Sequence, residues 1–423
     1  MGSDIVDRIR ASISAQEVAD LAFELVKVPS PTGSEGAVAR LYAERLEAFG
    51  VRASLRSVEA GRPNVLGRLE GQGGGRSLML YGHLDTIPSE GCVAPRRDED
   101  VVWGRGASDM KGSLAAMALA ARAVVESGVR LRGDLYIAGG VGHEIPWPLH
   151  STLGHGDGAK ELARSIRAGE LRADCCLIGE GPMDSAWVVQ GGLAPWRLTI
   201  SGGPGAVHST TTTLDHNPAV WAAEVVRDLY DYSQELGRRG THPLIGQAPR
   251  VEIGEVTSGD YFNRNPAQAT LVGNIRWHPG WTEEEVHGHF RARLEAVRAG
   301  LAARHGDDSI RLELFIRTGK AACDTREHPG TARLIEALDA AARPVMGPLR
   351  EPCGGRAATD LEIFHRIAGI PTIAFGPRLQ PEALPSDKRP GGAHSDDEGV
   401  SVESLGLVSR VYAGLILELC GIS

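Results

Sequence analysis

The chain has 423 residues, of which 42% are hydrophobic and 23% charged, a balance typical of a soluble globular protein. Its length predicts two or three domains, or one large domain that carries an insertion. The formal net charge is −9, and no run of Lys or Arg stands out. Because an acidic surface repels phosphate groups, this composition argues against a nucleic-acid partner.

The N-terminus and the cysteines bear on the location of the protein. Residues 1–7 lack the basic segment and apolar run of a secretory signal, and no apolar run approaches the roughly 20 residues that span a bilayer. The six cysteines form no C-x-x-C pair, which favours buried free thiols in a chain too long to need disulfide bonds. We therefore expect a cytoplasmic protein without a membrane partner.

The first half of the chain predicts helices and strands in alternation. Helical spacing of apolar residues marks residues 16–28, 34–49 and 110–125. Strand-like runs occupy residues 51–58, 64–69, 77–81, 134–138 and 175–178. This alternation predicts an α/β, doubly wound domain with a mixed sheet, in which ligands bind beyond the carboxyl ends of the strands.

The pattern changes near residue 190. Strands are predicted at 196–200, 250–255, 269–277 and 309–316, and helices at 218–236 and from a capping box at 282–285. The last segment again has the strand and helix pattern of an α/β domain, with a strand predicted at 371–375 and a helix at 401–420. We therefore expect a catalytic domain of residues 1–190 and 311–423, and an inserted α+β domain of residues 191–310.

Five short stretches place His, Asp or Glu just after a predicted strand or at the start of a helix. They are residues 82–85, 104–112, 143–144, 179–181 and 391–395. Imidazole and carboxylate groups without thiolates suit Zn, Mn, Co or Fe(II), and Asp109 at a helix start is well placed to bridge two ions. In the His-x-Asp pair, the carboxylate of Asp85 is expected to orient the second ring nitrogen of His83.

In this order the five stretches resemble metallopeptidase family 20 of clan MH, the aminoacylase and glutamate-carboxypeptidase family. The resemblance covers nearly the whole chain and is most specific in Gly-His-x-Asp-x-x-Pro at 82–88 and Gly-Arg-Gly-x-x-Asp-x-Lys-Gly at 104–112. It implies one or two divalent ions, Mn(II) or Zn(II), with Co(II) or Fe(II) as further options. The implied ligands are His83, Asp109 and Glu180 for one ion, and Asp109, Glu144 and His394 for the other.

The resemblance also gives the inserted domain a role, since in the family this domain dimerises and acts as a lid. By position, His208 corresponds to a substrate-binding and catalytic residue of the lid, and Asn263 and Arg276 to substrate-binding residues. Arg356 is a further candidate for binding an anionic group on the substrate. We therefore expect a homodimer and a small substrate that carries an anionic group.

One departure from the family concerns the general base. The family has Glu-Glu where this chain has His143-Glu144, and the first Glu is the base. His143 then acts as the base, as a third nitrogen ligand, or as a residue that orients Glu144. In this departure the chain resembles a family member that deaminates an aromatic amine, and the resemblance implies hydrolytic deamination of an aromatic amine such as 5-nitroanthranilate to the hydroxy compound and ammonia. The alternatives are an N-acyl amino acid deacylase or dipeptidase, and a metal-holding binding protein without activity.

Overall fold

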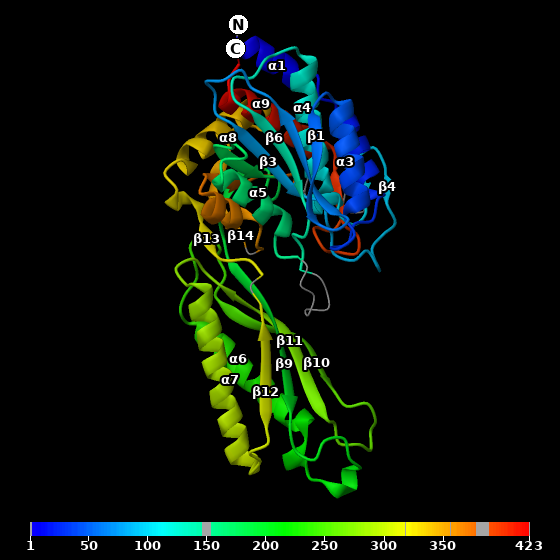
Figure 1. Ribbon diagram of the computed structural model, residues 1–423, viewed down its shortest axis with the longest axis vertical. Helices are drawn as coiled ribbons and strands as arrows, with labels where there is room; N and C mark the ends of the chain where they lie inside the picture. Colours follow the sequence, from blue (N-terminus) through cyan, green and yellow to red (C-terminus); the bar gives the residue numbers. More distant parts are fainter. Residues whose placement is uncertain (1, 146–153, 318, 356, 378–388, 423) are drawn as a thin grey trace. The chain divides into compact units, whose positions relative to one another are not determined.

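The computed structural model describes residues 2–145, 154–317, 319–355, 357–377 and 389–422, in two compact units (Figure 1). Unit 1 comprises residues 1–188, 324–354 and 359–423. Unit 2 comprises residues 189–323 and 355–358. Arg356, one of the expected substrate-binding residues, lies outside the described residues.

A nine-stranded mixed sheet forms the centre of unit 1, with the order β1-β2-β6-β3-β7-β15-β8-β13 and with β14 paired to β8. Its strands are β1 (Arg52–Glu59), β2 (Arg62–Leu69), β3 (Leu78–His83), β6 (Leu135–Gly140), β7 (Cys175–Ile178), β8 (Ser185–Gln190), β13 (Cys323–Asp324), β14 (Arg350–Gly355) and β15 (Thr372–Ala374). Strand β3 pairs in parallel with both β6 and β7, whereas β1 and β2 are antiparallel. A small second sheet contains β4 (Arg96–Arg97), β5 (Val101–Trp103) and β16 (Gly399–Ser401).

The helices of unit 1 pack on this sheet and on each other. They are α1 (Gly2–Ala11), α2 (Ala15–Val26), α3 (Gly36–Ala48), α4 (Gly112–Glu126), α5 (Asp157–Arg167), α8 (Thr331–Met346) and α9 (Val402–Cys420), with shorter helical turns at Ala107–Lys111, Thr325–Glu327 and Ile363–Ala368. Helices α4 and α9 contact each other and are buried over most of their length, in keeping with their alanine- and leucine-rich sequences. Among the described helices, none is long and apolar enough to cross a membrane.

The central strands bring the predicted site residues to one edge of the sheet. His83 is the last residue of β3, His143 follows the end of β6, and Glu180 follows the end of β7. These three strands are neighbours in the order β6-β3-β7 and run in parallel, so their carboxyl ends meet. The mixed sheet, together with the separate antiparallel sheet of unit 2, confirms the predicted fold class.

Unit 2 contains a four-stranded antiparallel sheet with the order β10-β11-β9-β12. Its elements are β9 (Gly192–Ser201), β10 (Arg250–Ser258), β11 (Gln268–Trp277), β12 (Arg311–Ile316), α6 (Pro218–Gly237) and α7 (Glu283–His305), with short turns at Ser209–Thr211 and Leu214–His216. Helix α7 begins at the capping box that the sequence predicted, formed by Thr282 and Glu285. Strand β12 pairs with β9 and therefore belongs to the sheet of unit 2, whose main segment extends to residue 323.

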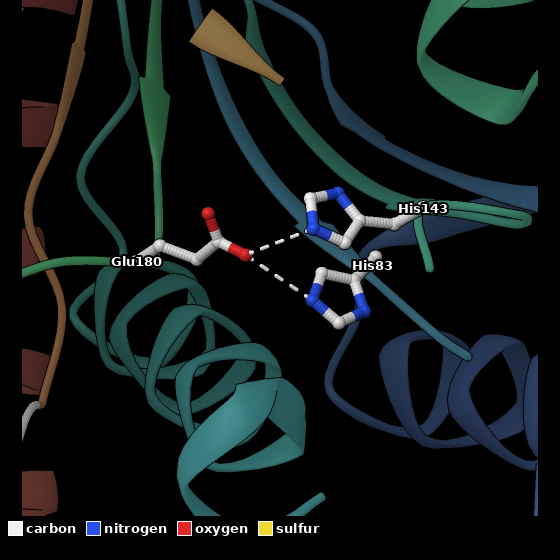
Figure 2. A group of neighbouring side chains, drawn as sticks. All are labelled: His83, His143 and Glu180. Atoms are coloured by element: carbon white, nitrogen blue, oxygen red, sulfur yellow. Dashed lines mark ion pairs between the residues drawn. The ribbon is translucent and has the colours of Figure 1, made fainter. Parts of the chain in front are cut away.

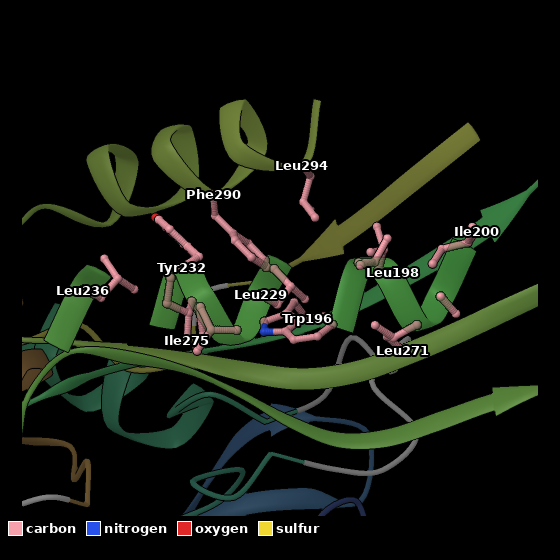
Figure 3. Close-up of a cluster of buried hydrophobic side chains, with 14 of the residues drawn as sticks. Trp196, Leu198, Ile200, Leu229, Tyr232, Leu236, Leu271, Ile275, Phe290 and Leu294 are labelled. Atoms are coloured by element: carbon pink, nitrogen blue, oxygen red, sulfur yellow. The ribbon is translucent and has the colours of Figure 1, made fainter. Parts of the chain in front are cut away.

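The core of unit 2 lies between its sheet and its two helices (Figure 3). Phe290 on α7 is fully buried, with its ring centroid 5.6 Å from that of Trp196 on β9 and 6.3 Å from that of Tyr232 on α6. Gly273 on β11 faces the Trp196 ring so closely that an added Cβ would lie 2.5 Å from it. A bulky ring therefore fills the space that a glycine leaves open.

We predict that Phe290→Ala lowers the free energy of unfolding of unit 2 by about 3–5 kcal/mol, because the deletion leaves a cavity between helices and sheet. Urea denaturation followed by tryptophan fluorescence measures this change. The matched control is Phe262→Ala, since Phe262 is 92% exposed and its removal is expected to change stability by less than about 0.5 kcal/mol. Equal effects of the two substitutions would contradict the assigned core.

Candidate metal centre

His83 lies at the end of the buried strand β3 and is itself fully buried. Its Nδ1 atom lies 2.8 Å from the backbone carbonyl oxygen of Asp85, which can only accept a hydrogen bond. Nδ1 therefore carries the proton in the neutral ring, and the lone pair is on Nε2. This Nε2 lies 2.9 Å from Oδ1 of Asp109 and 3.2 Å from Oε1 of Glu180, so it faces two carboxylates.

The carboxylate of Asp85 has a different role from the one expected. It lies 3.7 Å from Nδ1 of His83, beyond hydrogen-bonding distance, because the chain turns after β3 and presents the peptide carbonyl to the ring. Instead it accepts hydrogen bonds from the backbone N–H groups of His143 at 3.0 Å and Glu144 at 2.9 Å, and from the Thr32 hydroxyl at 2.8 Å. Asp85 therefore holds the segment that carries His143 and Glu144.

A second cluster shares Asp109 with the first. Oδ2 of Asp109 lies 3.4 Å from Nε2 of His394, which in turn lies 2.9 Å from Oε1 of Glu144. His394 adopts a φ of +68°, a conformation uncommon for a residue other than glycine and one that is often retained at functional sites. Asp109 therefore presents one carboxylate oxygen to His83 and the other to His394.

These donor atoms fit divalent metal ions. Ring nitrogens and carboxylate oxygens face one another at 2.9–3.4 Å, close to the separation of about 3.4 Å between tetrahedral ligands that each lie about 2.1 Å from an ion. Within the described residues, Oε2 of Glu180 is buried without a hydrogen-bond partner. Hydrogen bonds to Asp109 and Glu144 raise the pKa of His394 to about 10, which shows how strongly this cluster attracts positive charge.

Glu398 fixes the loop that carries Asp109, a contact that the sequence did not predict. Its buried carboxylate accepts hydrogen bonds from the backbone N–H groups of Gly106, Ser108 and Asp109, at 3.0, 3.1 and 3.1 Å. It also pairs with Arg105 at 2.7 Å. The orientation of Asp109 therefore depends on a buried ion pair from a distant part of the chain.

The ring of His143 lies against the ring of His83 (Figure 2). Their centroids are 4.1 Å apart and their planes differ by 4°. Nε2 of His143 is 3.5 Å from Oε1 of Glu180, and Nδ1 is 2.9 Å from Oδ2 of Asp360. The same Asp360 oxygen accepts a hydrogen bond from the Tyr81 hydroxyl at 2.8 Å.

The lid residues expected from the sequence belong to unit 2. Nε2 of His208 lies 3.0 Å from Nδ2 of Asn263, so these two are neighbours in space although they are 55 positions apart. Arg276 lies on β11 and donates from Nε to Oδ1 of Asn274 at 3.1 Å. Burial lowers the pKa of its guanidinium group, which still carries its charge at neutral pH.

Asp360 and Glu398 are the two residues of this centre that sequence reasoning missed. Asp360 contacts His143 across 217 positions and Glu398 contacts Asp109 across 289, so no local spacing connects either pair. The available signal was weak in both cases. Asp360 is one of two carboxylates close together, with Glu362 two positions later, and Glu398 follows His394 by four positions.

The chain is similar to known proteins in sequence and in fold. A sequence model of peptidase family M20/M25/M40 matches residues 79–418. The succinyl-diaminopimelate desuccinylase of Alkalilimnicola ehrlichii is 27% identical over 419 residues, covering 96% of this chain and 100% of that protein. The dipeptidase Dug1p of Saccharomyces cerevisiae has a similar fold, with a TM-score of 0.74 at 14% identity over 99% of both chains.

A dinuclear metal-binding peptidase of Bacillus subtilis has the same fold, with a TM-score of 0.63 at 14% identity over 96% of this chain and 98% of that one. These likenesses agree with the family that the five sequence stretches indicated. The desuccinylase relative does not support the expected deamination of an aromatic amine, and it favours the alternative of a deacylase or dipeptidase. Because the family match covers most of the chain, the protein belongs to peptidase family M20/M25/M40 and is a metal-dependent hydrolase of C–N bonds.

Proposed function

We propose that the protein hydrolyses the amide bond of an N-acylated amino acid, including the dipeptide case in which the acyl group is itself an amino acid. The observation that supports it best is the pair of ligand clusters joined by the two oxygens of Asp109. The 27% identical relative is a desuccinylase, and similar folds include a dipeptidase, both of which cleave amide bonds. Such substrates also carry a carboxylate, which agrees with the anionic group expected from the sequence.

In this proposal two divalent ions are held by side chains from both clusters. The proposed ligands are His83, Asp109 and Glu180 for one ion, and Asp109, Glu144 and His394 for the other. A bound ion supplies Lewis-acid polarisation of the amide carbonyl and lowers the pKa of water. His143 then accepts a proton at Nε2 and returns it to the leaving nitrogen, the role that glutamate has in the family.

A substrate and metal panel tests this function. Chelation should abolish activity, and Mn(II), Zn(II) or Co(II) should restore hydrolysis of N-succinyl or N-acetyl amino acids or of dipeptides. Asp109→Asn should lower kcat by more than about 100-fold and reduce the bound metal, because both clusters lose a ligand. The control Asp308→Asn changes an exposed aspartate of unit 2 and should have no effect. Full activity without metal would contradict the proposal, and so would a protein that hydrolyses aromatic amines but none of the amides. Metal binding without turnover of any substrate would favour a binding protein.

We propose further that Arg276 and His208 bind the carboxylate of the substrate, with Asn263 beside His208. A guanidinium group matches the paired oxygens of a carboxylate, and lysine offers only a point charge. Arg276→Lys is therefore expected to lower kcat/KM roughly 10- to 100-fold, mainly through KM. Arg250→Lys is the matched control, because Arg250 lies opposite Arg276 on the neighbouring strand. Wild-type kinetics in Arg276→Lys would remove this residue from the site.

We also propose that unit 2 forms a homodimer contact. Strand β10 is an edge of its sheet. Its C-terminal half, residues 254–258, is exposed and includes Val256, which is 50% exposed. Edge strands with apolar side chains are ready to pair with a second copy. Sedimentation velocity at micromolar concentration should show a dimer, and Val256→Lys should shift it toward the monomer. A monomer at all concentrations would contradict the contact and leave the metal centre untouched.

A further inference from the structure

The side of His143 that faces away from Glu180 is held by a buried carboxylate. Asp360 is fully buried, and its Oδ2 atom lies 2.8 Å from the Tyr81 hydroxyl and 2.9 Å from Nδ1 of His143. The Tyr81 hydroxyl is placed to donate its proton to this oxygen. A carboxylate can only accept, so Nδ1 of His143 is the second donor and the lone pair of the neutral ring is on Nε2.

The parallel rings decide what that lone pair can do. An ion bound to an imidazole lies in the plane of the ring, about 2.1 Å from the nitrogen, because the lone pair lies in that plane. The rings of His83 and His143 are stacked at 4.1 Å with planes 4° apart, so no point within bonding distance of both rings lies in both planes (Figure 2). An ion held by His83 is therefore not shared with His143 while the rings keep this arrangement.

We infer that Asp360 is a positioning residue: it fixes the proton of His143 on Nδ1 and keeps its ring parallel to that of His83, so that Nε2 is a proton acceptor and not a second ligand of the ion held by His83. This inference rests on the proposed function and goes beyond it, because it explains how an imidazole can stand where the family has a glutamate. A glutamate needs no such partner, since both of its oxygens accept. A histidine accepts at only one nitrogen, and a neighbour must decide which one.

The same contact stabilises the ring after proton transfer. When Nε2 of His143 takes a proton, the ring becomes a cation whose Nδ1–H still donates to Asp360. The carboxylate then offsets the positive charge without itself accepting the proton. The backbone N–H of His143 is held by Asp85 at 3.0 Å, so the ring is fixed from two directions.

The first test reads the tautomer directly. Full-length protein labelled with 15N-histidine and loaded with Zn(II), which is diamagnetic, is studied by long-range 1H–15N NMR, with His143→Gln to assign the signal. We expect a protonated Nδ1 and an unprotonated Nε2 at His143. A proton on Nε2 in the wild-type protein would overturn the inference, and this measurement needs neither a variant of Asp360 nor a substrate.

The second test separates positioning from ligation. Asp360→Asn keeps the shape of the side chain but offers an N–H to the ring, so the tautomer should reverse and kcat should fall about 100-fold or more with KM within about threefold. Zn(II) affinity, measured by calorimetry, should stay within about threefold of the wild type. Loss of a partner that supports a true ligand typically weakens metal binding 10- to 100-fold.

Tyr81→Phe is the matched control, because it removes one hydrogen bond to Asp360 and leaves the carboxylate in place. It should keep the Nδ1 tautomer and lose less than about tenfold in kcat. Asp360→Asn with wild-type kcat, or with Zn(II) affinity lowered tenfold or more, would overturn the inference. The tautomer and metal measurements decide it independently of whether the amide panel finds a substrate.

Discussion

The geometry of the candidate centre depends on where one carboxylate is held. Asp109 faces His83 with one oxygen and His394 with the other, although these histidines are 311 positions apart in the chain (394 − 83). A side chain that must meet two partners tolerates little rotation, and the backbone of Asp109 is held by Glu398. Glu398 is itself paired with Arg105 in a buried site. Breaking such a pair leaves an uncompensated buried charge, so this network is expected to be sensitive to change at any member.

Two stacked histidines at the same sheet edge differ in what holds their second nitrogen. Nδ1 of His83 donates to a peptide carbonyl, and Nδ1 of His143 lies against the carboxylate of Asp360. A peptide carbonyl is neutral, whereas the carboxylate can offset a positive charge that forms on the ring. The partner of Nδ1 thus suits each imidazole to a different proposed role: His83 offers a lone pair to a metal ion, and His143 offers a site for a proton.

Unit 2 has a hydrophobic core of its own, and the residues of this core are distinct from those of the metal centre in unit 1. Its aromatic residues lie between helices and sheet, and the proposed substrate contacts lie on β11 and in the segments around His208 and Asn263. Strand β12 belongs to this core, because its register pairs six residues with β9. The sequence predicted a strand at 309–316, and the structure has β12 at Arg311–Ile316, but a strand prediction does not say which sheet the strand joins.

The sequence by itself determined the family, the fold class and the residue types of the site. Buried parallel strands read as apolar runs, their carboxyl ends are followed by His83, His143 and Glu180, and the motifs at 82–88 and 104–112 are specific. These features are local, because they depend on neighbours within about ten positions. The capping box at the start of α7 was predictable for the same reason.

Only the tertiary structure decided how the site residues are oriented. In the structure, His83 contacts the backbone carbonyl of Asp85 and not its carboxylate. Asp360 contacts His143, and Glu398 contacts Asp109, although the members of each pair are more than 200 positions apart in the chain. Such contacts arise where separate segments of the fold meet at one sheet edge, and the spacing of residues along the chain carries no record of them. The tautomer of a histidine depends on the atom that contacts its ring nitrogen. The protonated nitrogen of His143 can therefore be inferred only from the folded structure.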